Sequence, residues 1–258
     1  MIVLCTDLDN TLIYSYKHDI GPHKRGAEWY RGREISFLTE RTYELLKELK
    51  RHMLIVPTST RTVEQYSRIH LGIGAFRYAL TCNGGVLLLD GCKDERWYRE
   101  SLELAGDSRD VMDEALRVLE HDARRSFELR FIEELFVFTK CEQPEAVAAD
   151  LKKRLDMRSV DVLLNGAKLY VIPKYLSKGM ALKRLKSRLK DSFFLAAGDS
   201  AFDISMLREA DVGFAPYGFQ KNYGIDFAVE EAGKGALFSE AFPERALQIF
   251  ASMGGKTE

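Results

Sequence analysis

Residues 2–12 read Ile-Val-Leu-Cys-Thr-Asp-Leu-Asp-Asn-Thr-Leu, a short apolar run that stops at Asp7. A second apolar run, residues 193–197, is followed by Gly198 and Asp199. Short continuous apolar runs of this kind are typical of strands buried on both faces. In open α/β sheets, ligands bind beyond the carboxyl ends of such strands. The two runs therefore predict an α/β fold with a doubly wound parallel sheet and acidic side chains at one edge.

The composition is that of an ordinary globular protein. The chain has 258 residues, 46% of them apolar, which allows a core domain and an insertion. Its formal net charge is −1, so we expect neither nucleic acid nor a membrane as a partner. No apolar run approaches the ~20 residues that span a bilayer, and the chain does not start with a signal-peptide pattern. Four cysteines without a Cys-x-x-Cys pair indicate a reduced, cytoplasmic protein.

The order of the remaining patterns predicts a core with an insert. A helix at about 40–52 and an apolar strand at 53–56 continue the β-α-β-α order of a doubly wound sheet. Residues 83–173 instead follow an α-β-β-α-β-β order, which is typical of a separate α+β module. We therefore predict a Rossmann-like core from residues 1–82 and 174–258, and an inserted α+β domain from 83–173.

Two segments depart from these patterns. Residues 14–36 contain Gly21-Pro22 and Gly26 and show no clear periodicity, so we expect a loop without regular structure. This stretch is longer than we expect before the first helix, so we expect it to cover the site and to narrow the choice of substrate. The stretch from about 236 to 253 has a helical pattern, and Pro243 predicts an interruption of that helix.

Four carboxylates share the predicted edge of the sheet: Asp7 and Asp9 after the first strand, and Asp199 and Asp203 where the later strand turns into a helix. Crowded carboxylates cannot all ionise unless a cation joins them. Because all four are hard oxygen donors, Mg²⁺ is the expected cation. Each pair alone is weak evidence, since an Asp after a strand is more often a solvated turn residue or a helix N-cap.

The same residue types suit phosphoryl transfer. Asp7 can attack phosphorus and form an aspartyl-phosphate. Asp9 can protonate the leaving oxygen and later take a proton from water. Ser59, in the turn at 58–62, and Lys178, at the start of a helix, can hold phosphoryl oxygens. The alternative interpretations are that Ser59 only caps a helix and that Lys178 is an ordinary exposed lysine.

As an ordered set, these motifs resemble those of the haloacid dehalogenase-like (HAD) superfamily. The set consists of Asp7-Leu8-Asp9-Asn10-Thr11-Leu12, Ser59, Lys178, and Gly198-Asp199 with Asp203. The insert lies between the second and third motifs, which resembles the C2 cap type. Its element content is similar to that of the type IIB subgroup, which includes Cof-like and sucrose-phosphate-phosphatase-like enzymes.

The resemblance implies a phosphatase that acts on a small phosphorylated metabolite, such as a sugar phosphate. It implies Asp7 as the nucleophile and Asp9 as the general acid and base. It also implies Mg²⁺ held by Asp7, by the backbone carbonyl of Asp9 and by Asp199. We expect Asp203 to bind the ion through water or to orient Lys178, the remaining catalytic residue.

Substrate binding is expected at two places. Ser59, Thr60 and Arg61 form the first, where Thr60 stands in place of the Gly that many relatives carry. Asn83 and Gly84 form the second, and they resemble the Asn-Gly turn that leads into the cap of these relatives. Two alternatives stay open: a phosphotransferase or phosphomutase of the same superfamily, and a regulatory binding protein without turnover.

Overall fold

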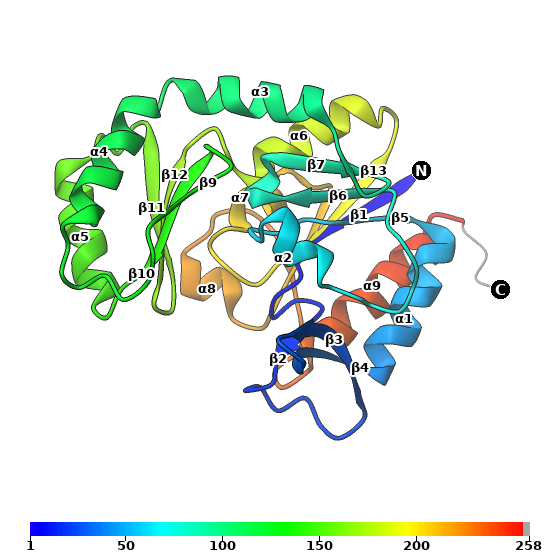
Figure 1. Ribbon diagram of the computed structural model, residues 1–258. Helices are drawn as coiled ribbons and strands as arrows, with labels where there is room; N and C mark the ends of the chain where they lie inside the picture. Colours follow the sequence, from blue (N-terminus) through cyan, green and yellow to red (C-terminus); the bar gives the residue numbers. More distant parts are fainter. Residues whose placement is uncertain (255–258) are drawn as a thin grey trace. The chain divides into compact units, whose positions relative to one another are not determined.

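The computed structural model of the chain describes residues 1–254. Contacts divide the chain into a core unit, which contains residues 1–93 and the segment from 178 onward, and an inserted unit, residues 94–177 (Figure 1). The inserted unit therefore starts later than the insert predicted from residue 83, because residues 86–93 pair with the strand before them and stay with the core. The end of the predicted core segment, 255–258, lies outside the described residues.

A five-stranded parallel sheet forms the centre of the core unit, in the order β15-β14-β13-β1-β5. Its strands are β1 (Ile2–Thr6), β5 (Leu54–Pro57), β13 (Phe193–Ala197), β14 (Val212–Ala215) and β15 (Glu230–Glu231). The chain proceeds from β1 to β5 on one side and later to β13 on the other, so β1 borders a topological switch point. This arrangement confirms the predicted doubly wound fold class.

The register of the two central strands positions the acidic motifs. Thr6 of β1 lies opposite Ala197 of β13, and the backbone N–H of Asp7 donates to the carbonyl of Ala197 at 2.9 Å. The next residues of both strands therefore emerge side by side. The carboxyl edge predicted to carry the acidic residues exists, and both motifs reach it.

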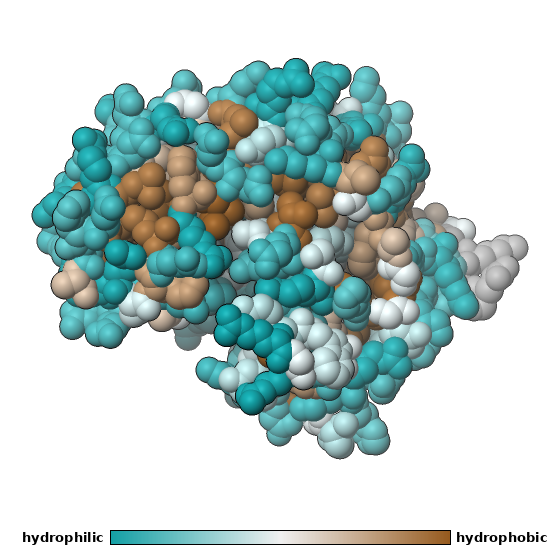
Figure 2. Space-filling view, viewed as in Figure 1, coloured by the Kyte–Doolittle hydropathy of each residue, from teal (hydrophilic) through white to brown (hydrophobic). Residues whose placement is uncertain are grey.

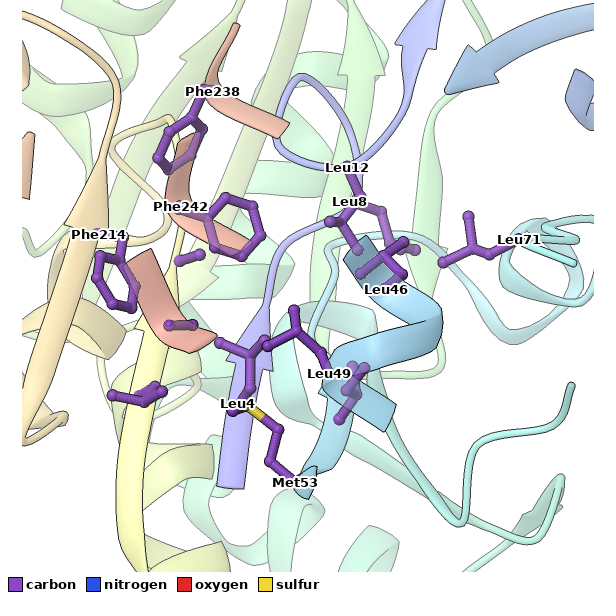
Figure 3. Packing of buried hydrophobic residues seen from close by; sticks show 14 of the residues in the cluster. Leu4, Leu8, Leu12, Leu46, Leu49, Met53, Leu71, Phe214, Phe238 and Phe242 are labelled. Atoms are coloured by element: carbon purple, nitrogen blue, oxygen red, sulfur yellow. The ribbon is translucent and has the colours of Figure 1, made fainter. Parts of the chain in front are cut away.

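Six helices of the core unit surround this sheet within the described residues. They are α1 (Glu40–His52), α2 (Val63–Ser67), α6 (Lys178–Arg188), α7 (Ile204–Glu209), α8 (Phe219–Tyr223) and α9 (Phe238–Ser252). Helices α1 and α9 lie side by side (Figure 1). Their apolar residues, such as Leu49 and Phe242, join Leu4 and Phe214 of the sheet in one buried cluster (Figure 3). This packing supports the strands that end at the acidic edge.

The predicted interruption of the last helix is wrong, because α9 runs through Pro243. A proline inside a helix removes one backbone donor, and the carbonyl four residues earlier loses its partner. Here that carbonyl belongs to Ser239, and it accepts instead from the hydroxyl of Thr42 in α1 at 3.2 Å. A tertiary contact thus compensates for the proline, which a sequence pattern cannot show.

Residues 14–39 form a small antiparallel sheet, so the predicted loop is also wrong. This N-terminal sheet contains β2 (Tyr14–Ser15), β3 (Lys24–Tyr30) and β4 (Arg33–Thr39) in the order β2-β4-β3. Arg31 and Gly32 connect β3 to β4 with positive φ values of 51° and 75°, as two-residue hairpin turns require. Shifts of register around Glu28 break the alternation of side chains that would have marked β3 as a strand.

A hairpin continues the core unit after the second motif. Strand β6 (Tyr78–Thr81) is followed by the 3₁₀ turn η1 (Cys82–Gly84), by β7 (Val86–Leu89) and by β8 (Cys92–Lys93). Asn83 and Gly84 have φ values of 58° and 88°, so the predicted Asn-Gly turn is present. The backbone N–H of Ser59 donates to the carbonyl of Leu80 at 2.8 Å, which fixes the second motif beside β6.

The inserted unit is an α+β module with the antiparallel strand order β11-β12-β10-β9. Its elements are α3 (Glu95–Gly106), α4 (Arg109–Glu120), β9 (Arg130–Ile132), β10 (Phe136–Lys140), α5 (Pro144–Arg154), β11 (Val160–Asn165) and β12 (Lys168–Pro173). Helix α3 was not predicted. It buries only Trp97, Ser101 and Ala105, a stripe with too little apolar character to be recognised.

Hydrophilic residues predominate on the face of the molecule seen in Figure 2, and hydrophobic ones form separate patches. Across residues 1–254, none of the helices combines the length and the apolar character needed to cross a membrane.

Candidate active site

Three carboxylates and one ammonium group gather at the carboxyl edge of the parallel sheet. Asp7 follows β1, Asp199 and Asp203 lie between β13 and α7, and Lys178 is the first residue of α6. One oxygen from each of the three carboxylates lies within 4.8 Å of the others. The ammonium of Lys178 donates to Oδ1 of Asp7 and to Oδ1 of Asp203, each at 2.6 Å. The structure therefore brings together four of the predicted site residues, which we call the acidic cluster.

Asp203 organises the loop that carries Asp199. Its Oδ2 accepts from the backbone N–H groups of Asp199 at 3.2 Å and Ser200 at 3.0 Å, and from the Ser200 hydroxyl at 2.8 Å. Gly198 must be glycine here, since a Cβ at that position would lie 2.3 Å from Cβ and Cγ of Asp203. Both oxygens of Asp203 are thus engaged by the protein, one with Lys178 and one with this loop.

The acidic cluster has more negative charge than its one ammonium can offset. Burial raises the pKa of Asp7 well above its ordinary value, and the charges of Asp203 and Asp199 raise it further, although Lys178 opposes this. Burial and the charge of Asp203 likewise raise the pKa of Asp199 to about 7. Burial alone would lower the pKa of Lys178, but the two carboxylates that it contacts raise it above its ordinary value. Lys178 is therefore charged, while the carboxylates compete for it.

This imbalance fits a divalent cation. Asp7, Asp199 and Asp203 offer hard oxygen ligands from a buried site, as Mg²⁺ prefers. A cation there would offset the repulsion that raises the pKa of Asp7 and Asp199. Three of the four carboxylates predicted to share a cation therefore lie where they could hold one, and the carboxylate of Asp9 is not among them.

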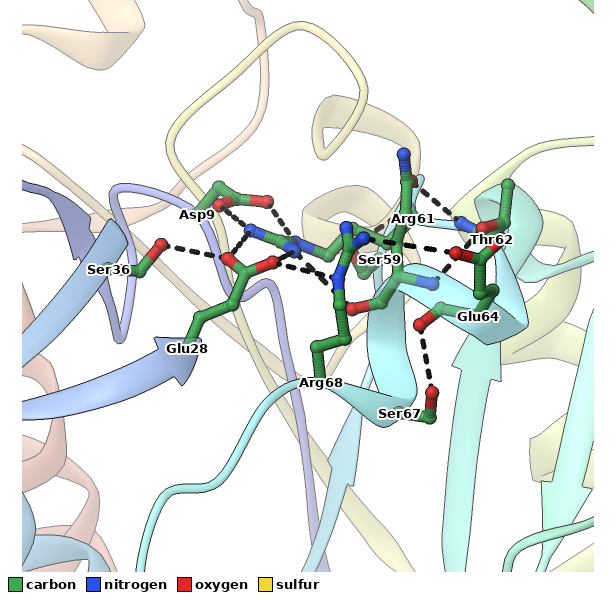
Figure 4. Close-up of polar contacts among 10 residues, drawn as sticks. Asp9, Glu28, Ser36, Ser59, Arg61, Thr62, Glu64, Ser67 and Arg68 are labelled. Carbon is green, nitrogen blue, oxygen red and sulfur yellow. Dashed lines mark hydrogen bonds and ion pairs between the residues drawn. The ribbon is translucent and has the colours of Figure 1, made fainter. Parts of the chain in front are cut away.

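The side chain of Asp9 lies in a second group of charges, drawn in Figure 4. Arg61 donates from Nε to Oδ2 of Asp9 at 2.8 Å and from Nη2 to Oδ1 at 2.7 Å. The same guanidinium donates from Nη1 and Nη2 to the two oxygens of Glu28, each at 2.9 Å. Burial alone would lower the pKa of Arg61, but Asp9 and Glu28 raise it above its ordinary value.

Glu28 also contacts two further side chains. Nε of Arg68 lies 3.3 Å from its Oε1, and the Ser36 hydroxyl donates to its Oε2 at 2.9 Å. We call Asp9, Glu28, Arg61 and Arg68 the arginine network. Sequence reasoning missed Glu28, since a single Glu in a segment with no recognised strand carries no signal.

The remaining predicted residues lie around the turn after β5. The carbonyl of Ser59 accepts from the N–H of Asn83 at 3.0 Å, and its hydroxyl accepts from the N–H of Arg61 at 3.2 Å. Thr60 lies between Ser59 and Arg61 and is partly buried, whereas Gly84 is buried in η1. The structure thus brings Ser59 and Asn83 together, while the guanidinium of Arg61 is occupied by Asp9 and Glu28.

Comparison with known proteins agrees with this architecture. Residues 91–216 match the sequence profile of a family described as haloacid dehalogenase-like hydrolase. Over these residues the chain is similar to that family. The match spans the inserted unit, Lys178 and the loop from Asp199 to Asp203, so it covers two of the four motifs directly. No curated protein matches the sequence significantly.

Solved structures of HAD-like proteins share the fold along nearly the whole chain. The sucrose-phosphatase of Synechocystis sp. PCC6803, in complex with sucrose and phosphate, superposes with a TM-score of 0.67 at 18% identity, covering 97% of this chain and 98% of that one. A HAD-superfamily phosphatase from Bacteroides thetaiotaomicron gives 0.59 at 17% identity, covering 97% and 95%. A haloacid dehalogenase-like hydrolase from B. subtilis gives 0.59 at 16%, covering 96% and 100%. These structures confirm the fold that the resemblance implies.

Proposed function

We propose that the chain is a Mg²⁺-dependent phosphatase that hydrolyses a small phosphorylated metabolite through an aspartyl-phosphate. The observation that carries the proposal is the buried acidic cluster, in which Lys178 contacts Asp7 at 2.6 Å beside two further carboxylates. The match of residues 91–216 to a hydrolase family supports the same reaction class. Phosphoryl transfer depends mostly on positioning and on neutralisation of charge, and the acidic cluster with a divalent cation would supply both.

In the proposed first step, a carboxylate oxygen of Asp7 attacks phosphorus. The bond between phosphorus and the leaving oxygen breaks, and that oxygen takes its electron pair and a proton from Asp9. A water molecule then attacks the phosphorus of the aspartyl-phosphate and gives a proton to Asp9. Inorganic phosphate leaves and the carboxylate of Asp7 is restored.

The other residues bind and orient. Lys178 would hold Asp7 in place and bind a phosphoryl oxygen, and Ser59 would donate its hydroxyl to another. Mg²⁺, when bound by Asp7 and Asp199, would supply positive charge that stabilises the transferring phosphoryl group. Asp203 would act mainly through Lys178, because both of its oxygens already accept hydrogen bonds. Thr60, Asn83 and Gly84 stay candidates for substrate binding.

The two units would divide the work. The core unit holds the proposed catalytic residues, and the inserted unit would be the cap that selects the substrate. A sugar phosphate is our proposed substrate class, because the sucrose-phosphatase shares the fold over nearly the whole length of both chains. A reducing, cytoplasmic location would fit the four cysteines, which are all free thiols.

The test is phosphate release from an aryl phosphate and from a panel of sugar phosphates. We expect turnover by the wild type, loss with EDTA, recovery with Mg²⁺, and a loss of at least about 1,000-fold in Asp7→Asn. Asp113→Asn, which removes an exposed carboxylate of α4, is the matched control and should behave as the wild type. Undiminished turnover in EDTA or in Asp7→Asn would contradict the proposal.

A further inference from the structure

Glu28 is buried, whereas the two residues that follow it in β3 are exposed. It is 1% exposed, whereas Trp29 and Tyr30, the next two residues of β3, are 56% and 41% exposed. The register of β3 against β4 shifts on both sides of Glu28. Such bulges redirect a side chain, and here the carboxylate is turned toward the turn after β5 (Figure 4).

Glu28 completes the hydrogen bonding of Arg61. A guanidinium has five N–H donors in one plane. Asp9 takes one edge of Arg61, through Nε at 2.8 Å and Nη2 at 2.7 Å. Glu28 takes the end, through Nη1 and Nη2 at 2.9 Å each, and the carbonyl of Gln65 accepts from Nη1 at 3.5 Å. All five donors are therefore used, and both the plane and the rotation of the guanidinium are determined.

The two carboxylates that Arg61 joins differ in their surroundings. The side chain of Asp9 is 45% exposed, whereas that of Glu28 is 1% exposed. Ser36 and Arg68 hold Glu28 from the other side. Glu28 is thus the fixed end of the chain of contacts, Arg61 is the link, and Asp9 is the end that faces solvent.

We propose that Glu28 is a positioning residue that holds Arg61, and through Arg61 orients the carboxylate of Asp9 for proton transfer. This inference rests on the proposed function, in which Asp9 protonates the leaving oxygen. General acid catalysis requires the acid within hydrogen-bond reach of the oxygen that it protonates. A misplacement of about 1 Å can cost about 100-fold in rate. The N-terminal sheet would therefore be a part of the active site rather than only a cover over it.

The effect of Glu28 should depend on the leaving group. An alkoxide or phenoxide that is a poor leaving group needs protonation, whereas p-nitrophenolate departs without it. We therefore compare kcat/KM for phenyl phosphate and p-nitrophenyl phosphate in the wild type and in Glu28→Gln. We expect a fall of about 30- to 100-fold for phenyl phosphate and of less than about fivefold for p-nitrophenyl phosphate. A fall of equal size for both substrates, which a merely structural role would cause, overturns the inference, as does no fall.

Two further variants separate positioning from stability. Glu34→Gln removes an exposed carboxylate of β4 in the same small sheet and leaves the contacts of Glu28 and Arg61, so both substrates should keep kcat/KM within about threefold. Arg61→Lys removes the guanidinium donors that join Asp9 to Glu28. Adding Glu28→Gln to this variant should therefore cause little further change in the ratio of kcat/KM between the two substrates. An additive effect in that double variant would contradict action through Arg61.

If Glu28→Gln does not fold, Glu28→Asp keeps the charge and should show the same preference for p-nitrophenyl phosphate at a smaller ratio. An equal fall for both substrates in Glu28→Asp would again overturn the inference. Failure of the proposed function has a different signature, because the wild type itself would then release no phosphate from either substrate.

Discussion

The acidic cluster and the arginine network lie in the same core unit, but they balance charge differently. In the acidic cluster, three carboxylates share the single ammonium of Lys178. In the arginine network, Asp9 and Glu28 face the guanidiniums of Arg61 and Arg68. The first group is short of positive charge and the second is not.

This difference shows what each group can do. A balanced network needs no further ligand, so it can serve as a fixed support, and Arg61 satisfies both of its carboxylates at 2.7–2.9 Å. An unbalanced cluster raises the pKa of its carboxylates and favours binding of a cation. We infer that the acidic cluster binds and reacts, whereas the arginine network orients.

Among the substitutions considered, loss of Lys178 should have the largest effect, because it removes the only ammonium group of the acidic cluster. Lys178→Met leaves buried carboxylates without their cation, so we expect the free energy of unfolding to fall by about 3–5 kcal/mol and turnover to be lost. Thermal unfolding in EDTA measures the first and phosphate release the second. Lys183→Met, on the exposed side of the same helix, removes a surface pair with Glu209 and should change stability by less than about 1 kcal/mol. An equal loss of stability in Lys178→Met and Lys183→Met would contradict the claim that the acidic cluster depends on Lys178 for its charge balance.

Asp199→Asn should stabilise the metal-free protein at neutral and higher pH. The pKa of Asp199 is raised to about 7 in the folded protein, so folding favours its protonated form. That contribution is present below the unfolded pKa and is lost as pH rises through about 7, because ionisation then costs more in the folded state. In EDTA, Tm of Asp199→Asn should exceed that of the wild type by an amount that grows from about pH 4 to about pH 7 and is constant above it.

With Mg²⁺ in place of EDTA, we expect Tm of the wild type to exceed that of Asp199→Asn. A ligand that binds only the folded state raises Tm, and we expect this rise in the wild type but not in Asp199→Asn. Parallel Tm curves for the two proteins, with and without Mg²⁺, would show that Asp199 is not part of an unbalanced cluster.

Gly198→Ala tests how closely the acidic cluster is packed. The added Cβ would lie 2.3 Å from Cβ and Cγ of Asp203, so Asp203 and its contact with Lys178 must move. We expect a loss of about 1–3 kcal/mol of stability, measured by denaturant unfolding, and a lower kcat. Gly106→Ala at the end of α3, where a Cβ meets nothing within 4 Å, should be neutral. Unchanged stability and kcat in Gly198→Ala would mean that the acidic cluster tolerates a displacement of Asp203.

Ser36→Ala, which removes a neighbour of the arginine network, should have the smallest effect of these substitutions. Ser36 donates one hydrogen bond to Glu28, which keeps its contacts with Arg61 and Arg68. We expect a loss of about 1–2 kcal/mol in denaturant unfolding, with activity retained. Ser67→Ala, an exposed position of α2, is the control. A loss of stability as large as that of Lys178→Met would show that the remaining contacts of the arginine network do not hold Glu28 in place.

The two groups also differ in how far the sequence alone predicts them. Asp7 and Asp199 follow continuous apolar strands, so their place at the sheet edge could be inferred from local pattern. Lys178 is predicted at the start of a helix, where a cation is unfavourable unless an anion lies nearby. That these residues lie close together could be predicted from one rule, namely that the carboxyl ends of parallel strands lie at the same edge of the sheet.

The arginine network could not be predicted in this way. Glu28 lies 33 residues from Arg61, on a strand whose bulge hides its alternation. The sequence suggested that Asp9 belongs with the metal ligands and that Arg61 binds substrate, whereas the structure joins their side chains. The pairing depends on where the N-terminal sheet packs, and no local spacing encodes that. Helix α3 and the continuity of α9 through Pro243 were missed for the same kind of reason.

The central claim is that the acidic cluster binds a divalent cation between Asp7 and Asp199. An anomalous difference map from a crystal grown with Mn²⁺, which takes the same oxygen ligands as Mg²⁺, tests it most directly. We predict a peak within about 2.0–2.3 Å of a carboxylate oxygen of each residue. A map with no peak between these two side chains, at a saturating concentration of Mn²⁺, would contradict the account.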